Sequence, residues 1–573
     1  MMARIVIDPI TRIEGHLRIE AAVDGGAVSD AWSSSTMFRG MEIVLRNRDP
    51  RDAWLFAQRI CGVCTTVHAL ASVRAVEDAV GATPPLNARL IRNIIAGTQY
   101  VQDHVVHFYH LHAFDWVDAV SATKADPAAT SRLAQSISAW PKSNPAYFAG
   151  IRDKIKAIVT SDQPSLFANG YWGHPAYRLA PEANLLLVAH YLEALDWQRE
   201  VVRVHAILGG KNPHPQTYLV GGMAIPIDPN SQAALNMERL DLMRGLLERA
   251  KTFVEQVYLP DAVLAASHYP EWFAHGAGHR TYMSYGDFPE PSDGVAGNRF
   301  ARGIVRLANG LHVDTVDQSK IAEYVTHSWY AYPDERAPLH PWQGETQPNY
   351  TGPQPPFEFL DVDHKYSWLK APRYDGEPME TGPLARLLVS YAAGRPDVKK
   401  TVDAALGALK LQPAALSSTL GRVVARVLET QLMAGWLLEW HDQLVANIAH
   451  GDLRIHDGSR WEPSTWPAEC EGWGFHEAPR GSLGHWIRIR NGAIENYQAV
   501  VPTTWNASPR DARGIRGPYE AALIGTPVVD PSRPLEILRT VHSFDPCMAC
   551  AVHVLDPNGG LIVNVDADRG GGW

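Results

Sequence analysis

The spacing of hydrophobic residues predicts a chain dominated by long helices. Apolar side chains recur at intervals of three and four residues over residues 87–120, 184–208, 235–258 and 414–448, and this repeat places them on one face of a helix. Residues 87–120 are interpreted as one helix or two. The glycines at 209–210 predict the end of the second helix, because glycine readily adopts the left-handed conformation that closes many helices. We interpret all four apolar faces as buried in a packed bundle.

Shorter segments with alternating hydrophobic and polar residues predict strands. Asp24-Gly25-Gly26 and Asn491-Gly492 each separate two such segments, and these residues are typical of hairpin turns. Asp49-Pro50 predicts the start of a helix that runs toward Cys61, and residues 534–543 have a helical pattern. The predicted strands cover residues 4–7, 17–23, 27–32, 485–490 and 493–501.

Two long stretches lack a clear repeat. Residues 125–165 contain many proline, serine and asparagine residues, and we expect mostly loops there. Residues 271–383 are rich in proline, glycine, tryptophan and tyrosine, which favours surface loops and small sheets wrapped on the helices. The chain has neither internal repeats nor a low-complexity linker. The predicted fold class is therefore α+β and predominantly helical, with small peripheral sheets and no clean domain boundary.

The composition is that of an ordinary globular protein with an acidic surplus. The 573 residues are 46% hydrophobic and 20% charged, and the net charge is −10. This balance disfavours nucleic acid and anionic membrane surfaces as partners, because both attract basic patches. No window holds the roughly 18 uninterrupted apolar residues of a membrane-spanning helix, and the N-terminus lacks the apolar core of a signal peptide. Any export is therefore expected to depend on another protein.

Four of the five cysteines form two Cys-x-x-Cys pairs at opposite ends of the chain. Cys61 and Cys64 make the first pair, and Cys547 and Cys550 make the second. A single pair is weak evidence, but two pairs this far apart suggest one four-thiolate site that joins the two ends. Soft thiolates select zinc, iron, copper or nickel. The residues alone leave open a redox-active metal, a structural zinc ion and two separate dithiols.

Several other polar residues have both a structural and a functional interpretation. Glu14 lies beside a glycine in a segment of mixed charge, which is typical of a solvated loop carboxylate. His68 could be a ligand or a packed core histidine. The histidines between residues 104 and 112 have a spacing that metals accept, but such histidines are more often buried rings with satisfied nitrogens. Cys470 has no partner motif, so we expect a structural role for it.

Five blocks of sequence resemble the large subunit of nickel–iron hydrogenases, in particular the membrane-bound uptake type. They are RIEGH at residues 12–16, RICGVC at 59–64, GGKNPHP at 209–215, EAPRG at 477–481 and DPCMACAVH at 545–553. The resemblance extends over essentially the whole chain, and the two cysteine blocks together are highly specific. It implies the fold of that family, in which long helices surround a buried metal site.

The resemblance implies a nickel ion held by Cys61, Cys64, Cys547 and Cys550. Cys64 and Cys550 would also bind an iron that carries carbon monoxide and cyanide ligands. The implied activity is the reversible heterolytic cleavage of H2 into protons and electrons, mainly H2 uptake that feeds a respiratory chain. Cys547 would be the first proton acceptor, and Glu14 would pass the proton outward.

Further residues match family positions around this centre. Arg480 matches an arginine placed over the open coordination site, and Asp103 and Asp545 match carboxylates that orient it. Pro479 and Thr503 match positions that line the diatomic ligands of the iron. The resemblance implies that Thr503 and Arg480 could donate hydrogen bonds to cyanide.

The resemblance also implies a second metal site and a maturation step. Glu42 and His553 match ligands of a magnesium (or iron) ion, and the carbonyl of Ala499 is a third candidate by its spacing. Large subunits of this family are made with a C-terminal extension that an endopeptidase removes after the last histidine. Residues 1–553 would then be the mature catalytic domain, and residues 554–573 the extension, whose pattern resembles a small hairpin.

The implied partners follow from the shortage of cysteines. Only Cys470 lies outside the two pairs, so the relay of iron–sulfur clusters must belong to a small subunit in a heterodimer. That subunit would pass electrons to a membrane cytochrome b. A maturation endopeptidase and nickel-insertion factors would act on a cytoplasmic precursor. This subunit would be exported together with the small subunit. The mature heterodimer would then lie on the periplasmic side of the cytoplasmic membrane as a peripheral protein. An H2-sensing regulatory protein is the alternative function, and a structural zinc protein is a more distant one.

Overall fold

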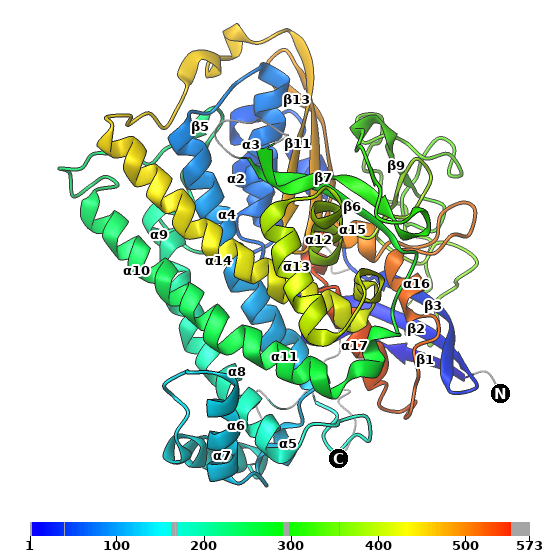
Figure 1. Ribbon diagram of the computed structural model, residues 1–573. Helices are drawn as coiled ribbons and strands as arrows, with labels where there is room; N and C mark the ends of the chain where they lie inside the picture. The colour runs from blue at the N-terminus through cyan, green and yellow to red at the C-terminus, as the bar shows by residue number, and fades with distance from the viewer. Residues whose placement is uncertain are drawn as a thin grey trace.

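Long helices packed side by side form the centre of the molecule (Figure 1). The computed structural model describes residues 3–38, 40–161, 167, 170–289, 297–354 and 356–551. Within this part of the chain, α4 and α14 lie against each other, α8 packs on α4, and α10 and α11 pack on α14. Their bounds are α4 (Leu86–Val106), α8 (Pro181–Val201), α10 (Met237–Phe253), α11 (Leu259–His268) and α14 (Thr419–Ala449).

Shorter helices complete the helical part, and side-chain caps start several of them. The hydroxyl of Ser418 accepts from the backbone N–H of Gly421 at the start of α14, and Asn236 caps α10 in the same way through the N–H of Arg239. The remaining helices are α1 (Met41–Leu45), α2 (Ala53–Ala57), α3 (Val67–Val80), α5 (Ala119–Ala122), α6 (Pro127–Ile137), α7 (Pro145–Val159), α9 (Arg203–Gly209), α12 (Pro383–Ala392), α13 (Pro396–Leu409), α15 (Pro502–Asn506), α16 (Pro518–Leu523), α17 (Leu535–Ser543) and α18 (Met548–Ala551).

The strands form small antiparallel sheets around the bundle. In the part of the chain that the structure describes, three of these sheets have three strands each, in the orders β1-β2-β3, β6-β7-β8 and β11-β12-β13, and the pairs β4-β5 and β9-β10 are two-stranded. The bounds are β1 (Ala3–Ile7), β2 (Leu17–Asp24), β3 (Ala27–Ser35), β4 (Tyr218–Leu219), β5 (Gly222–Met223), β6 (Thr281–Pro289), β7 (Asn298–Arg306), β8 (Val313–Asp314), β9 (Ile321–Tyr324), β10 (Ala371–Tyr374), β11 (Glu469–Ala478), β12 (Gly481–Arg490) and β13 (Ala493–Val500).

The largest core lies between the long helices, and a smaller one surrounds the cysteines. Ile94 and Val101 of α4, Leu187 of α8 and Leu437 of α14 belong to the large core. Burial of each such side chain contributes roughly 1.5–3 kcal/mol relative to exposure. The small cluster joins α3, the turn between β11 and β12, and the C-terminal cysteine segment; its buried members are Ile60, Cys61, Cys64, Val67, Ala71, Ala478, Leu483, Val501 and Cys547.

The observed elements confirm the predicted fold class, with one clear correction. The predicted hairpins at both ends and the helices near residues 87–120, 235–258, 414–448 and 534–543 are present. Residues 125–165 were expected to be mostly loops, and this prediction was wrong, because they contain α6 and α7. Each of these helices begins with a proline behind an Asp or Asn cap, so proline here starts a helix rather than interrupting one.

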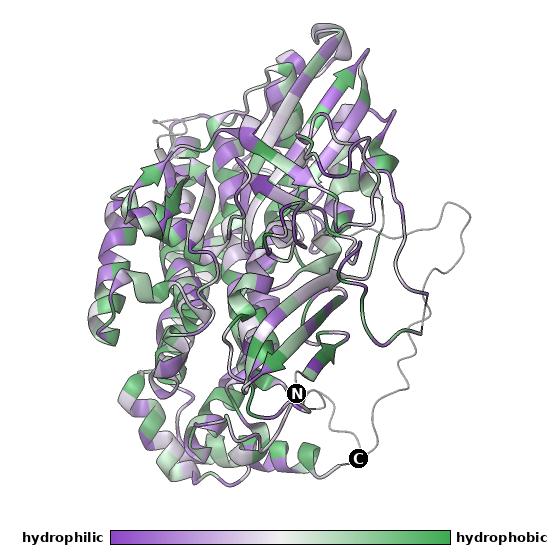
Figure 2. Ribbon diagram, turned by 90° about the vertical axis from the view of Figure 1, so that its right-hand side faces the viewer, coloured by the Kyte–Doolittle hydropathy of each residue, from purple (hydrophilic) through white to green (hydrophobic). Residues whose placement is uncertain are grey.

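The hydropathy of the helices is mixed along their length (Figure 2). Among the described residues, no helix is both long enough and apolar enough to cross a membrane.

Candidate metal centre

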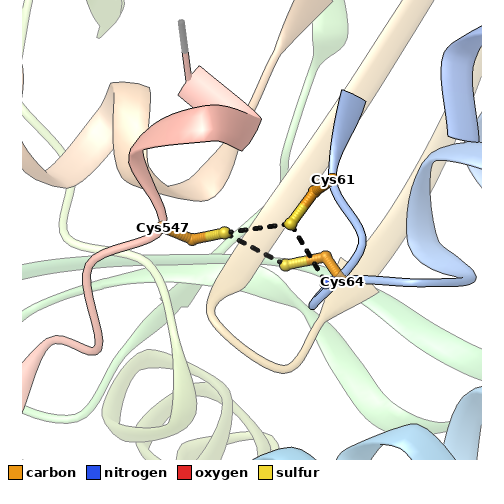
Figure 3. Close-up of side chains that lie close together, drawn as sticks. All are labelled: Cys61, Cys64 and Cys547. Carbon is orange, nitrogen blue, oxygen red and sulfur yellow. Dashed lines mark hydrogen bonds between the residues drawn. The ribbon is translucent and has the colours of Figure 1, made fainter. Parts of the chain in front are cut away.

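Three cysteine sulfurs from opposite ends of the chain meet in one buried cluster (Figure 3). The Sγ of Cys547 lies 3.5 Å from that of Cys61 and 3.4 Å from that of Cys64. All three side chains are at most 2% exposed. Cys550 follows in α18, three positions after Cys547. Buried thiols at these separations can act together as ligands of one soft or borderline metal site.

Local structure fixes each sulfur in a different way. Cys61 directly follows a helical turn at Gln58–Ile60 and is itself extended, with φ −145° and ψ 135°. The backbone N–H of Cys64 donates to Cys61 Sγ at 3.2 Å. The pair therefore shares a turn before α3. The N–H of Cys547 donates to the hydroxyl of Thr503, at the start of α15, at 3.2 Å.

Glu14 lies against the C-terminal cysteine segment. Its Oε2 accepts from the N–H of Ala549 at 2.7 Å and lies 3.5 Å from Cys547 Sγ. Its carbonyl accepts from the N–H of Met548, so the two segments form a short parallel bridge. Gly15, at φ +79°, permits this approach, because a Cβ there would lie 2.8 Å from Ala549 N. The interpretation of Glu14 as a solvated loop carboxylate was wrong.

The guanidinium of Arg480 occupies the other side of the cluster. Its Nη1 donates to Cys64 Sγ at 3.2 Å and to Asp103 Oδ2 at 3.1 Å, and its Nη2 lies 3.0 Å from Asp545 Oδ1. Arg480 is 3% exposed and the two aspartates are nearly fully buried. Asp545 has a left-handed backbone with φ 60°, which is uncommon for a residue other than glycine. The site thus combines soft sulfur donors with a fixed cation.

Burial sets the protonation behaviour of the carboxyl groups around this cation. It raises the pKa of Asp103 to about 8, against the opposing effect of Arg480. Burial also raises the pKa of Asp545, although Arg480 and Arg426 oppose the shift. The pKa of Glu14 is raised as well, because its desolvation outweighs the hydrogen bond from Ala549. Burial alone would lower the pKa of Arg480. The negative charges of Asp545 and the nearby sulfurs outweigh this effect and hold the pKa well above its usual value.

A small pocket opens beside Cys64 and Cys547. Apolar side chains form much of its wall, while Arg480, Thr503 and His68 supply polar groups. The lining residues are Cys64, Val67, His68, Ala478, Arg480, Leu483, Pro502, Thr503 and Cys547. Pro479 is next to this wall, and its carbonyl points to Arg386, whose Nη2 donates to it at 2.8 Å. A wall of this kind suits small, weakly hydrated ligands next to the sulfurs.

The predicted second site has two of its candidates in neighbouring elements. Glu42 lies on α1, which packs against β13, the strand that carries Ala499. Burial raises the pKa of Glu42, partly offset by Lys370. Lys370 donates to Gln498 at 2.9 Å and to Glu323 at 3.3 Å. His553, the third candidate, and the extension at residues 554–573 lie outside the described residues.

The histidines of the 104–112 stretch are hydrogen-bonded, and all of them except the partly buried His110 are buried. His104, His107 and His110 bond Glu429, the carbonyl of His542 and the carbonyl of Tyr191, respectively. His112, Asp115 and His542 also bring three possible ligand atoms together. There, Asp115 already accepts from both imidazoles and from Arg12. These contacts agree with the interpretation of the histidines as packed rings with hydrogen-bonded nitrogens, and not as metal ligands.

Sequence reasoning missed the buried charges behind the site. Arg386, Arg426 and Glu429 lie on α12 and α14 and are at most 1% exposed. The available signal was a charged residue inside a helix that is apolar on nearly every side, as Arg386 is among Leu384, Ala385, Leu387 and Leu388. Such a charge must have a buried partner.

Comparisons with known proteins agree with this geometry. A family profile described as nickel-dependent hydrogenase matches residues 39–553, and one described as HoxL-like matches residues 4–34. The uptake hydrogenase large subunit of Bradyrhizobium diazoefficiens is 52% identical, across 98% of this chain and 97% of that protein. The hydrogenase-1 large chain of Escherichia coli is 49% identical with the same coverage. A solved NiFeSe hydrogenase variant from Desulfovibrio vulgaris Hildenborough has a TM-score of 0.78 at 36% identity, covering 96% of this chain and 99% of its own.

The chain belongs to the nickel-dependent hydrogenase family. Within that family it is a catalytic large subunit of the uptake type, an oxidoreductase that oxidises H2. The family supports a nickel–iron centre, and a large subunit implies a small-subunit partner. The uptake-type relatives favour this function over the H2-sensing and zinc alternatives.

Proposed function

We propose that this subunit cleaves H2 heterolytically at a nickel–iron centre held by Cys61, Cys64, Cys547 and Cys550. The observation that carries the proposal is the meeting of three buried sulfurs from the two ends of the chain. The Sγ of Cys547 lies 3.5 Å from that of Cys61 and 3.4 Å from that of Cys64. Thiolate sulfur is the donor that nickel and iron accept in such sites. When bound, the centre would supply the place where H2 is split and would take up its electrons.

Protein groups at and beside the sulfurs would accept the proton released from H2 and pass it outward. Cys547 Sγ is the proposed first acceptor, and Glu14 Oε2, 3.5 Å away, the next. Burial raises the pKa of Glu14 above its usual value, which makes the carboxylate a stronger proton acceptor than an exposed one. The hydrogen bond from Ala549 at 2.7 Å holds the carboxylate in this position.

Arg480 would act as a fixed positive charge over the reacting position. Asp103 and Asp545 hold its two terminal nitrogens at 3.1 and 3.0 Å, so the guanidinium plane has little freedom. An ordered cation in a buried site stabilises developing negative charge without a reorganisation cost. Orientation by the aspartates is therefore part of the proposed chemistry.

The lining of the pocket beside Cys64 supports the proposal that carbon monoxide and cyanide on the iron would lie there. Val67, Ala478, Leu483 and Pro502 offer an apolar wall that suits carbon monoxide. The Thr503 hydroxyl accepts from Cys547 N, which leaves its own O–H to donate toward a cyanide nitrogen. Arg480 is the second proposed donor, and Pro479 the adjoining wall residue.

We propose a second ion, magnesium or iron, near Glu42 and the Ala499 carbonyl, with His553 as a further ligand. Carboxylate and carbonyl oxygens are the donors that magnesium prefers. Lys370 and Glu323 lie in the same region. Burial is the main cause that raises the pKa of Glu323, and the charge of Glu323, followed by Tyr332 and Glu42, raises that of Lys370 against the effect of burial. The ion would tie α1 to the end of the mature chain.

Electrons would leave through an iron–sulfur small subunit. A four-iron cluster needs four cysteines, and Cys470 is the single cysteine outside the proposed centre. We propose that a membrane cytochrome b accepts the electrons on the periplasmic side of the cytoplasmic membrane. The heterodimer would be exported together as a peripheral protein.

Maturation would remove residues 554–573 after nickel insertion, leaving His553 as the C-terminus. The match to the family profile ends at residue 553, which supports this boundary. Nickel-insertion factors would load the cytoplasmic precursor, and the endopeptidase would act next. Intact mass spectrometry tests the order: active heterodimer should lack the extension, and nickel-starved protein should retain it. Active enzyme that keeps the extension would contradict the proposed step.

Elemental analysis tests the proposed centre. The mature heterodimer should hold nickel in a one-to-one ratio with this subunit, together with iron beyond that of the small-subunit clusters. Zinc without nickel, in protein matured by a competent host, would overturn the proposal.

A further inference from the structure

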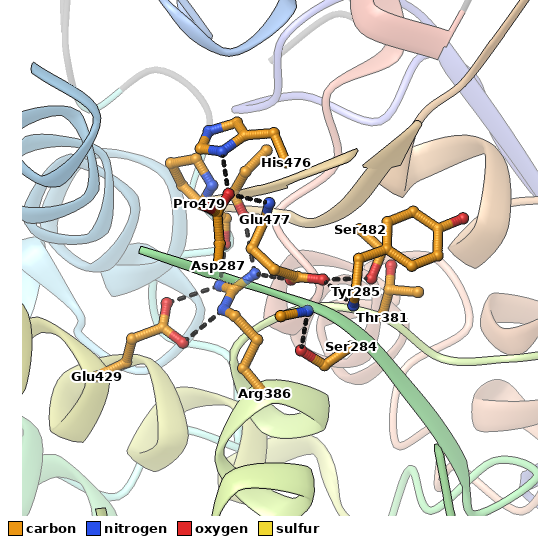
Figure 4. A network of polar contacts seen from close by, with 12 residues as sticks. Ser284, Tyr285, Asp287, Thr381, Arg386, Glu429, His476, Glu477, Pro479 and Ser482 are labelled. Carbon is orange, nitrogen blue, oxygen red and sulfur yellow. Dashed lines mark hydrogen bonds and ion pairs between the residues drawn. The ribbon is translucent and has the colours of Figure 1, made fainter. Parts of the chain in front are cut away.

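A second arginine, Arg386, lies next to Pro479, the residue that precedes Arg480 (Figure 4). It comes from α12 and is fully buried. Its Nε and Nη2 donate to the two oxygens of Glu429 at 2.7 and 2.6 Å, and its Nη1 donates to Glu477 Oε2 at 2.9 Å. The guanidinium thus has carboxylate partners for all three of its nitrogens.

The same guanidinium also holds the backbone next to Arg480. Its Nη1 donates to the carbonyl of Ala478 at 2.7 Å, and its Nη2 donates to the carbonyl of Pro479 at 2.8 Å. These are the two peptide units that precede Arg480 in the turn between β11 and β12. Arg386 therefore fixes the backbone from which the Arg480 side chain starts.

The start of α12 is pressed against the same turn. A Cβ on Gly382 would lie 3.1 Å from the carbonyl oxygen of Arg480, and a Cβ on Gly481 would lie 2.8 Å from Gly382 N. Both glycines have φ between 120° and 145°, a region that other residues rarely adopt. The backbone of Arg386 also donates to Gly382 O at 2.9 Å. The start of α12 and the turn that carries Arg480 therefore pack closely against each other.

A chain of buried hydrogen bonds and ion pairs leads from Arg386 to the other end of Arg480. Glu429 bonds His104 Nε2 at 2.8 Å, and Arg426 lies 3.1 Å from His104 Nδ1. Arg426 is 3.5 Å from Asp545, which holds the Arg480 guanidinium. Arg480 is thus held at its backbone directly by Arg386 and at its charged end through this chain.

We propose that Arg386 is a positioning residue that sets where the guanidinium of Arg480 stands over the cysteine cluster. This inference rests on the role of Arg480 proposed above. Lysine in place of Arg386 keeps the charge but has one nitrogen, which cannot serve two carboxylates and two carbonyls together. The turn would shift, and Arg480 would lose its alignment. Small displacements of this kind reduce rates by large factors.

Arg92 offers a matched control elsewhere in the core. It is 3% exposed, donates to both oxygens of Glu77, and donates to the carbonyls of Leu219 and Gly222 at 2.9 Å. It therefore has the same kind of partners as Arg386 but does not touch the turn that carries Arg480. Arg92→Lys reports the cost of weakening a buried arginine clamp without displacing Arg480.

The experiment compares Arg386→Lys, Arg92→Lys and Arg480→Lys as nickel-loaded heterodimers. For each we measure kcat and KM for H2, the melting temperature, and the infrared bands of the iron-bound diatomics. Arg386→Lys should lower kcat by about tenfold or more with KM nearly unchanged, and should shift the bands in the same direction as Arg480→Lys. Arg92→Lys should lower the melting temperature and leave kcat and the bands near wild type.

The outcomes distinguish a failure of positioning by Arg386 from a failure of the proposed role of Arg480. If Arg480→Lys has wild-type kcat and bands, the proposed role of Arg480 fails. If Arg480→Lys is impaired but Arg386→Lys behaves like Arg92→Lys, positioning by Arg386 is overturned. Should Arg386→Lys protein fail to incorporate nickel, Glu429→Gln decides, because it weakens the hold on Arg386 and keeps the arginine. Shifted bands in Glu429→Gln would support the inference, and wild-type bands would overturn it.

Discussion

Replacing Glu14 with glutamine isolates the proposed proton transfer from the metal site. The amide keeps the size of the side chain, and its oxygen can still accept from the N–H of Ala549, now 2.7 Å from the carboxylate. It cannot take a proton from Cys547 and release it again. The variant should therefore assemble a normal centre and fail at one step.

The contacts of Glu14 set the expected magnitudes. Exchanging a charged acceptor for a neutral one at Ala549 weakens that hydrogen bond by about 1 kcal/mol, a small loss for a large protein. Removal of a general base or acid typically lowers a rate by 10²–10⁴-fold, or about 3–5 kcal/mol of barrier. The effect on rate should therefore greatly exceed the effect on stability.

Two activity assays and one spectrum test this prediction. H2 oxidation with a dye and H/D exchange with solvent should fall together in Glu14→Gln, while the infrared bands stay in place. Glu14→Asp is the matched control, because it keeps a carboxylate but withdraws it by about 1.5 Å, and it should retain intermediate rates. Wild-type exchange in Glu14→Gln would refute the reasoning and show that protons leave by another route.

Four further substitutions have equally definite expectations. Cys61→Ser should abolish nickel incorporation measured by elemental analysis, whereas Cys470→Ser, at a half-buried position of β11, should leave it largely intact. Arg480→Lys should lower H2 oxidation by more than tenfold, or more than about 1.4 kcal/mol, with the centre assembled. Burial raises the pKa of Glu520 from 4.5 to about 7, because the folded protein favours the neutral carboxylic acid. The contribution of this group to the free energy of unfolding is therefore fully present below pH 4.5 and is lost as the pH rises through 7. Glu520→Gln should remove roughly 3 kcal/mol of that dependence, seen as a smaller fall in melting temperature between pH 5 and pH 8; an unchanged fall would contradict it.

Local patterns in the sequence were enough to predict most long elements. The helices near residues 87–120 and 414–448 have apolar faces that any packed bundle would bury, so tertiary structure only reinforces the local signal. Residues 125–165 were mispredicted, because Pro127 and Pro145 were taken as loop residues. The caps Asp126 and Asn144 in front of them were the better signal.

Long-range contacts explain what local patterns could not provide. Two cysteine pairs already predicted a shared site, because their chemistry is specific wherever they lie in the chain. Glu14 appeared to be a loop carboxylate, since nothing nearby in sequence shows that residues 547–549 pack on it. The roles of Arg386 and Glu429 could not be predicted from the sequence, because they depend on the packing of α12 and α14 beside the turn that carries Arg480.

An infrared spectrum of the purified, nickel-loaded heterodimer tests the central claim most directly. The claim is that Cys61, Cys64, Cys547 and Cys550 hold a nickel–iron centre whose iron carries carbon monoxide and cyanide. Bands of metal-bound carbon monoxide and cyanide should appear in the wild type and vanish in Cys64→Ser. A spectrum without such bands, from protein that contains nickel and oxidises H2, would contradict the claim.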